Sequence, residues 1–180
     1  MAKGSFQKRV LSLGFFNQPT LKAAKSLLGK FLVRRYRGKE TVLMITEVEA
    51  YDGLEDRASH ASRGKTERNK IMFGPAGYWY VYFIYGMHWL LNIVTGPKEY
   101  PAAVLIRGTE QAIGPARLTK RLKIDSKFNG RSASKKTGLW IEDRGVKIKP
   151  SRIASEKRIG VEYAGQWADK PYRFRITTCR

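Results

Sequence analysis

Cysteine and histidine are both scarce in this chain of 180 residues, which contains one cysteine and two histidines. The single cysteine, Cys179, excludes a disulfide within the chain. One cysteine and two histidines are also too few for the usual structural zinc sites. We therefore expect a reduced, intracellular setting, with no metal site and no other cofactor.

Long apolar runs are missing as well. The first residues, MAKGSFQKRVLSLGFF, include basic side chains but no sustained apolar stretch and no small-residue cleavage site. No apolar run reaches the roughly 20 residues that a membrane-spanning helix needs. We expect neither export nor membrane insertion, and we expect residues 1–17 to form a flexible basic leader of a single domain that spans residues 1–180.

Acidic residues are too few to balance the basic ones. The chain has 15 Asp and Glu against 35 Lys and Arg, which gives a net charge of +20. Such a positive field attracts polyanions, and nucleic acid is the leading candidate partner. A cationic ribosomal or chromatin protein would have the same balance, so charge alone names no chemistry.

Hydrophobic periodicity predicts a single α+β domain. Leu21, Ala24, Leu27 and Leu28 have the spacing of one helix face, and Gly29 follows them. A second, basic helix is expected after Gly114-Pro115, and a mobile charged loop over 125–137. Strands, which would form a mixed sheet, are expected over 31–36, 41–51, 78–85, 88–95, 103–107, 139–142, 158–163 and 172–177.

Acidic side chains are concentrated in one short segment of this basic chain. Five of the fifteen lie within ten positions: Glu47, Glu49, Asp52, Glu55 and Asp56. Strand alternation places Glu47, Glu49 and Tyr51 on one face. A solvated strand face is one interpretation. The other is a general base beside an aromatic platform, because a positioned carboxylate can take a proton from attacking water.

The tip of the predicted aromatic hairpin is the second candidate feature. Tyr85-Gly86-Met87 joins the two strands, and an apolar ring at such a tip resembles a wedge that unstacks bases. Simple packing of Tyr85 and Met87 on the core is the alternative. Tyr80 and Tyr82 share a strand face that alternation places opposite Tyr85, so one side of the hairpin could line a pocket.

The segment that contains both features resembles the 3-methyladenine (alkyladenine) DNA glycosylase family. The resemblance is carried by ITEVEAYDGLEDRASHASRGKTERNKIMFGPAGYWYVYFIYGMHWLLNIVTG. It continues through AAVLIRGTE, GPARLTKRLKI and RIGVEYAGQWADKPYRFRI, and so covers most of the chain after Thr20. It implies a compact domain with a curved, mostly antiparallel sheet, surrounding helices and a protruding hairpin.

The resemblance also implies roles for individual residues. Glu49 is the expected general base, with Arg107 and the Val161 carbonyl holding the attacking water. The residues expected to contact the extruded base are Tyr51, His60, Tyr82 and Asn92. The expected DNA contacts are the intercalating Tyr85 with Met87, and the phosphate-binding Arg63, Lys65 and Arg68. Many family members have Pro where this chain has Glu67, which places an acid in a segment expected to meet phosphates.

The activity that the resemblance implies is that of a monofunctional DNA glycosylase acting on duplex DNA. The protein would work as a monomer, in the cytoplasm, nucleoid or nucleus, on 3-methyladenine, 7-methylguanine, hypoxanthine or ethenoadenine. A non-catalytic nucleic-acid binder is the main alternative. A glycosylase-lyase needs a nucleophilic lysine, and no lysine replaces Glu49. A zinc deaminase needs a P-C-x-x-C motif, which a chain with one cysteine cannot contain.

Overall fold

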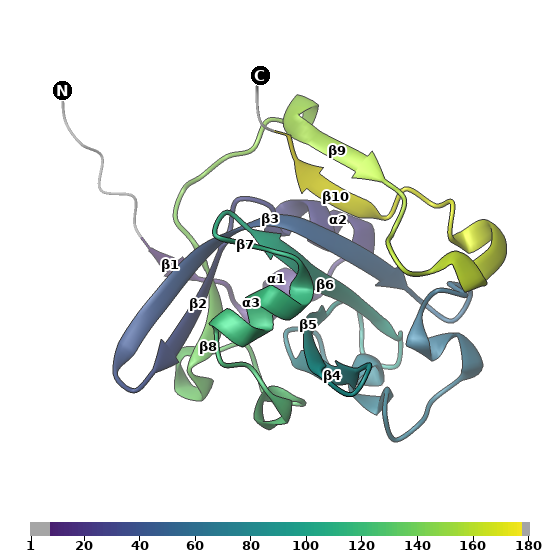
Figure 1. The fold of residues 1–180 in the computed structure, drawn as a ribbon, viewed down its shortest axis with the longest axis horizontal. Helices are drawn as coiled ribbons and strands as arrows, with labels where there is room; N and C mark the ends of the chain where they lie inside the picture. The colour runs from purple at the N-terminus through teal and green to yellow at the C-terminus, as the bar shows by residue number, and fades with distance from the viewer. Residues whose placement is uncertain (1–7, 178–180) are drawn as a thin grey trace.

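The sheet is built around one long strand. The computed structural model describes residues 8–177, and within it β3 (Lys39–Asp52) crosses the molecule from one side to the other (Figure 1). Its first half pairs with β2 (Phe31–Tyr36), and its second half pairs with β6 (Ala102–Thr109). The β3–β6 register shifts on either side of Glu47, and such an irregularity bends a strand locally.

The pairings that the structure describes are all antiparallel, so the α+β prediction is confirmed and the mixed sheet is wrong. The main strand order is β1-β8-β2-β3-β6-β5-β4. The remaining strands of this path are β1 (Arg9–Val10), β8 (Leu139–Asp143), β5 (His88–Val94) and β4 (Trp79–Ile84). Off the path, β10 (Arg173–Ile176) pairs with β3 and β9 (Ile153–Glu156), and β7 (Ala112–Ile113) pairs with β6.

Three short α-helices accompany the sheet: α1 (Leu13–Phe16), α2 (Thr20–Leu27) and α3 (Pro115–Arg121). Both predicted helices are therefore confirmed. The α2 helix packs on β3 and β6, and α3 packs on β5 and β6. Six 3-10 turns complete the described structure: η1 (His60–Arg63), η2 (Lys70–Phe73), η3 (Ser126–Phe128), η4 (Lys135–Thr137), η5 (Pro150–Arg152) and η6 (Glu162–Trp167). Within residues 8–177, no helix is both long and apolar enough to cross a bilayer.

The main core lies on one face of the central strands. Val104 and Ile106 of β6, with Leu91 and Ile93 of β5, are buried in one cluster together with residues of α2 and α3. Because side chains alternate along a strand, the intervening residues of β6 and β5 point to the opposite face. That face carries the cavity described below.

Two predicted flexible segments have defined structure. Within the expected leader, β1 pairs with β8 and the side chains of Leu11 and Phe16 are buried. Residues 1–7 of that leader, and Cys179, lie outside the described residues. In the expected mobile loop 125–137, Phe128 is buried and the Asn129 side chain accepts a hydrogen bond from the Val81 N–H. Each segment thus places apolar side chains in the main core: Leu11 and Phe16 in the first, and Phe128 in the second.

The strand predicted over 158–163 is wrong. Residues 158–161 are irregular and η6 begins at Glu162, while the strand that pairs with β10 is β9, a few residues earlier. Gly160 has a φ of 75°, which lies outside the β region and breaks any strand at this point. The chain instead turns toward the second half of β3.

Candidate active site

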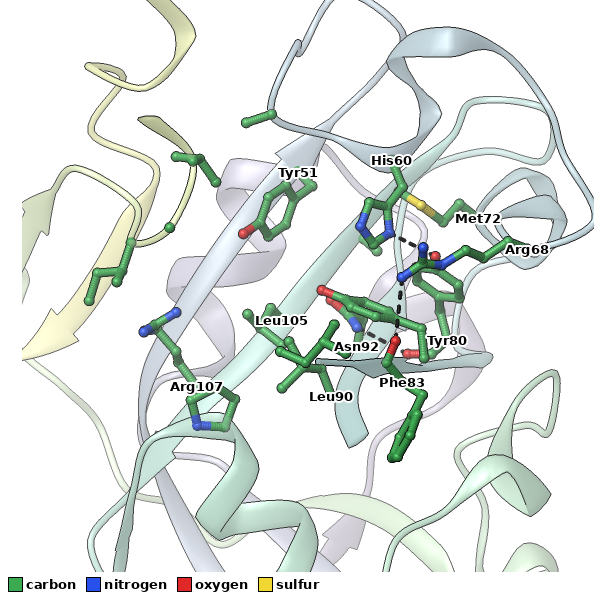
Figure 2. A pocket seen from close by; sticks show the side chains of 18 of the residues that line it. Tyr51, His60, Arg68, Met72, Tyr80, Phe83, Leu90, Asn92, Leu105 and Arg107 are labelled. Atoms are coloured by element: carbon green, nitrogen blue, oxygen red, sulfur yellow. Dashed lines mark hydrogen bonds between the residues drawn. The ribbon is translucent and has the colours of Figure 1, made fainter. Parts of the chain in front are cut away.

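A cavity of about 590 Å³ opens on the face of the sheet opposite the main core. Alternate residues of β4, β5 and β6 form its floor, and loops on either side form its walls (Figure 2). Its floor includes Tyr80, Tyr82, Leu90, Asn92, Ala103, Leu105 and Arg107. Strand alternation thus explains why these side chains gather in one place although they come from three strands.

Aromatic rings dominate one side of the cavity. The His60 ring centroid lies 4.6 Å from that of Tyr82, and the Tyr80 and Tyr82 centroids are 5.2 Å apart. Tyr51 adds a fourth ring, and Figure 2 shows it between the His60 side and the Arg107 side of the cavity. These rings provide the flat, polarisable surfaces on which another planar ring can stack.

His60 is neutral at physiological pH in this setting. Desolvation among the aromatic rings, with a smaller contribution from the Arg68 charge, lowers the pKa of His60 to about 4. Its Nδ1 lies 2.9 Å from the Tyr80 hydroxyl oxygen. Burial raises the pKa of Tyr80 to about 12, so its hydroxyl stays protonated. The hydroxyl can therefore donate a hydrogen bond to Nδ1 of a neutral His60. The cavity therefore presents no imidazolium charge to a ligand.

Asn92 lies on the cavity floor. Its side-chain Nδ2 donates to the Tyr80 carbonyl over 3.1 Å, which fixes the orientation of the amide. The side chain is almost fully buried but lines the cavity. A fixed amide can select among planar ligands by the hydrogen bonds it accepts and donates.

Glu49 lies directly behind the cavity wall. Its side chain is 0% exposed, and it is not among the residues that line the cavity. The Ile159 N–H and the Tyr51 hydroxyl each donate to one of its carboxylate oxygens over 2.9 Å. Burial raises the pKa of Glu49 above its usual value, while the nearby Arg107 charge and these two hydrogen bonds oppose the rise. A carboxylate whose pKa is raised is a stronger proton acceptor than an ordinary glutamate.

Arg107 connects Glu49 to the cavity. Its Nη1 lies 3.2 Å from Glu49 Oε1, its Nε lies 3.4 Å from Glu47 Oε1, and its side chain lines the cavity. Glu47 also accepts a hydrogen bond of 2.9 Å from Arg173. The predicted shared face of Glu47, Glu49 and Tyr51 is thus consistent with these contacts, and two arginines neutralise its charge.

Val161 lines the cavity and belongs to the irregular segment that was predicted as a strand. Its carbonyl accepts one hydrogen bond, of 2.9 Å, from the Ala164 N–H. A carbonyl oxygen has two lone pairs, so one remains for a further donor such as water.

The hairpin tip lies at the mouth of the cavity. Tyr85 is 83% exposed and Met87 is 66% exposed, so neither packs on the core. Tyr85 lines the same cavity as Tyr80 and Tyr82, and the expectation of opposite sides is wrong. Alternation fails here because Tyr85 has a φ of 51° and belongs to the turn rather than to β4.

A second hollow, of about 550 Å³, adjoins the first and is strongly basic. It is lined by Arg57, Arg63 and Arg68 with hydroxyl and amide side chains, and it shares His60, Arg68 and Tyr163 with the first cavity. No acidic side chain is among the residues described as lining it. Such a surface suits an anionic group.

Two lysines that follow η1, one of them the predicted phosphate contact Lys65, form ion pairs with glutamates. Lys65 does not line the second hollow, and it lies 3.4 Å from Glu99 in an exposed ion pair. Glu67, the residue that departs from the family pattern, is exposed and pairs with Lys70 over 2.7 Å. Because Lys70 neutralises the Glu67 charge locally, Glu67 repels a nearby polyanion only weakly.

Three site residues were not singled out from the sequence. Tyr163 lines both cavities and is exposed, and a fully buried ion pair joins Asp56 to Arg158 behind the Tyr51 ring. Asp56 was noticed only as part of the acidic cluster. No periodicity signals a pair 102 residues apart in the chain; only the fold brings the two loops together.

The site combines an aromatic cavity with a buried carboxylate and a basic rim. The description of the matching family model is methylpurine-DNA glycosylase, and the model matches residues 14–113 and 109–180. This chain belongs to that family of DNA glycosylases, as the resemblance of its motifs indicated.

Similar proteins from several organisms are also named as DNA glycosylases. One from Methanocella arvoryzae, named "Putative 3-methyladenine DNA glycosylase", is 42% identical and the alignment covers 92% of this chain and 91% of the relative. Relatives of that name from Legionella pneumophila (strain Lens) and an Anaeromyxobacter species (strain Fw109-5) are 43% and 41% identical. Those alignments cover 93% and 92% of this chain, and 94% and 88% of the relatives.

Proposed function

We propose that this protein extrudes a damaged purine from duplex DNA and hydrolyses its N-glycosidic bond. The observation that carries the proposal is the fully buried Glu49 carboxylate, held by Tyr51 and Ile159 directly behind an aromatic cavity. In this step a water oxygen bonds to C1′ of the deoxyribose, and Glu49 takes a proton from that water. The C1′–N bond breaks, its electron pair leaves with the base, and an abasic site remains.

Three groups would hold the water: Glu49, Arg107 and the free lone pair of the Val161 carbonyl. Arg107 and Val161 line the cavity, whereas Glu49 is covered. A small displacement of the Arg107 guanidinium or the Tyr51 hydroxyl is therefore needed before the water contacts the carboxylate. Catalytic hydrogen bonds often reach their working geometry only when substrate binds, so this arrangement suits an enzyme in its free state.

Selection of alkylated purines would come from the aromatic wall. A base made cationic by alkylation is attracted by the faces of Tyr51 and Tyr82, in addition to stacking. A neutral His60 adds a ring without adding repulsion, because its pKa is about 4. Asn92 on the floor would discriminate between purines at one edge of the ring. The same family resemblance points to 3-methyladenine, 7-methylguanine, hypoxanthine and ethenoadenine as the substrate class.

Base extrusion would depend on the hairpin tip and the basic rim. Removing a base from the stack costs a few kcal/mol, and less when the base is damaged. Tyr85 would fill the gap, while Arg63 and Arg68 in the second hollow would contact the DNA backbone by charge. One copy of the chain contains both cavities, so we expect the protein to act as a monomer.

The decisive measurement is base release from defined duplexes. Duplexes that each carry one of the four lesions are incubated with the protein, and the free base and alkali-labile abasic sites are quantified. A monofunctional glycosylase releases the base and leaves the strand intact until alkali is added. A non-catalytic binder would retard the duplexes without releasing any base, and borohydride trapping of the protein on DNA would indicate a lyase.

A further inference from the structure

A buried ion pair lies behind the cavity wall, between loops from distant parts of the chain. Asp56 follows β3 and Arg158 follows β9, and both side chains are 0% exposed. Arg158 Nη2 donates to Asp56 Oδ1 over 2.8 Å, and its Nη1 donates to Oδ2 over 2.5 Å. Taking two charges out of water is costly, and well-packed apolar residues often stabilise a fold equally well. The pair therefore points to a need to hold the two loops in one fixed arrangement.

Both partners also bind the backbone around them. The Asp56 carboxylate accepts hydrogen bonds of 3.1 Å from the N–H groups of Asp52 and Ala58. Arg158 donates to the Ala50 carbonyl over 2.9 Å and to a carbonyl of η6 over 3.0 Å. The pair thus joins the end of β3, the loop after it and the segment that leads into η6.

This unit ends next to the groups that surround Glu49. Ile159, the residue after Arg158, donates its N–H to Glu49, and Val161 lines the cavity two residues further on. The Arg158 guanidinium also lies 4.9 Å from the centroid of the Tyr51 ring, whose hydroxyl donates to Glu49. Neither member of the pair lines the cavity.

We propose that Asp56 and Arg158 are a positioning pair for hydrolysis: they hold segment 158–161 so that the Ile159 N–H stays on Glu49 and the Val161 carbonyl faces the cavity. The proposal rests on the proposed role of Glu49 as the base. Neither residue of the pair touches substrate; both act through Ile159, Tyr51 and Val161.

The groups around Glu49 determine the direction in which its pKa changes when the Asp56–Arg158 pair is lost. The titratable and charged groups packed around it are Arg107 from β6, Glu47 and Tyr51 from β3, Tyr82 from β4, Arg173 from β10 and Arg158 itself. A hydrogen bond from the Ile159 N–H favours the ionised carboxylate, so losing this bond raises the pKa of Glu49. Replacing Asp56 by Asn also removes a negative charge and leaves Arg158 unneutralised, and this direct Coulomb effect lowers the same pKa. The two effects oppose each other.

The test is single-turnover excision from a lesion duplex by Asp56→Asn as a function of pH. Loss of positioning predicts a rate about 10- to 100-fold lower at neutral pH, with duplex affinity nearly unchanged. In Arg158→Lys, which keeps a positive charge at this position, loss of the Ile159 hydrogen bond predicts that the acid limb of the rate moves toward higher pH. This variant loses the paired hydrogen bonds to Asp56, and it tests the proposal even if Asp56→Asn folds poorly.

Asp169→Asn is the matched control. It removes the pair between Lys157 and Asp169, which is 2.6 Å long but about two-thirds exposed, one residue before Arg158. Rates are normalised to the folded fraction, which thermal unfolding reports for each variant. The control should leave both the rate and the acid limb unchanged.

An acid limb that stays in place or moves to lower pH in Arg158→Lys overturns the proposal, because the pair then serves only to stabilise the fold. Failure of the proposed function has a different signature. In that case the wild-type protein releases no base, or Glu49→Gln excises as fast as wild type, and a role in positioning for hydrolysis falls with it.

Discussion

Glu49 combines two opposing influences at a single residue. Its complete burial favours the protonated acid, whereas Arg107, the Ile159 N–H and the Tyr51 hydroxyl favour the carboxylate. Burial is the larger effect, so its pKa lies above the ordinary value. A general base works best when its pKa approaches the operating pH, and this balance moves Glu49 in that direction.

Glu49→Gln is the first test at this scale. It preserves the size of the side chain but removes the proton acceptor, so we expect excision to fall by at least ~10²-fold. Binding to lesion duplex should remain, because Glu49 does not line the cavity. Single-turnover base release and gel-shift affinity measure the two quantities separately. Excision near the wild-type rate would remove Glu49 from its proposed role.

The pH dependence of excision follows from the same residue. The reaction needs the ionised carboxylate, so the rate should fall as pH drops through the pKa of Glu49, above the range of an ordinary glutamate. Arg107→Gln removes the main influence that lowers this pKa. We therefore expect the acid limb of the Arg107→Gln profile to lie at higher pH than that of wild type. An acid limb at or below the wild-type position would show that Arg107 does not stabilise the carboxylate.

At the scale of elements, the two parts of the β4–β5 hairpin have different surroundings. Its strands contribute Tyr80, Tyr82 and Asn92 to the cavity, and its turn carries Tyr85 out into solvent. Tyr85 and Gly86 both have positive φ, with values of 51° and 66°, and the Met87 N–H bonds to the Ile84 carbonyl over 3.1 Å. This tight turn fixes the direction of the exposed ring without burying it.

Tyr85→Ala tests the role of the turn. It should weaken binding to lesion duplex by about 1–3 kcal/mol, the worth of one base–aromatic stack, and should affect undamaged duplex far less. Ile113→Ala is a suitable control, because Ile113 is also an exposed apolar residue on the sheet but does not line the cavity. Titrations of both duplexes over a salt series provide the comparison. Equal weakening of both, with a changed salt slope, would make the tip a general DNA contact.

Arg63→Ala should weaken DNA binding without discriminating between lesion and undamaged duplexes, in contrast to Tyr85→Ala. If Arg63 in the second hollow contacts a phosphate, its loss weakens lesion and undamaged duplexes alike and reduces the salt slope by about one unit. Lys65→Ala should change the slope less, because Lys65 is paired with Glu99. The same titrations measure these slopes. Weakening confined to the lesion duplex would place Arg63 in recognition of the extruded base.

The sequence predicts the features that depend on neighbouring residues better than those that depend on contacts between residues far apart in the chain. Strand β2 and helix α2 were predicted within a residue or two, because local periodicity determines them. The shared face of Glu49 and Tyr51 follows from alternation along β3. Segment 158–161 could not be predicted in this way, because its backbone is set by the Asp56–Arg158 pair and the positive φ of Gly160.

At the scale of the whole molecule, the net charge of +20 acts together with the local contacts. A positive field of this size raises the rate of encounter with DNA and is screened by salt. It does not distinguish damaged from undamaged DNA. Under the proposed function, discrimination comes from the aromatic cavity, and affinity for undamaged duplex should be lost first as salt rises.

Chelation provides a test of the whole reaction. The proposed water is activated by Glu49 and oriented by Arg107, so excision should proceed at the same rate in excess EDTA. Base release with and without EDTA, after dialysis of the protein, measures this directly. Loss of activity that a divalent ion restores would show that a metal takes part.

The order of the strands along the chain has a consequence for biosynthesis. Glu49 lies in β3, early in the chain, but its Ile159 partner and the β10 residue opposite it, Arg173, are translated more than 100 residues later. A nascent chain that already contains the aromatic hairpin and β6 still lacks the segment that holds the carboxylate. Under the proposed mechanism, a nascent chain therefore gains its complete catalytic site only after segment 158–161 and β10 have been translated and have packed on β3.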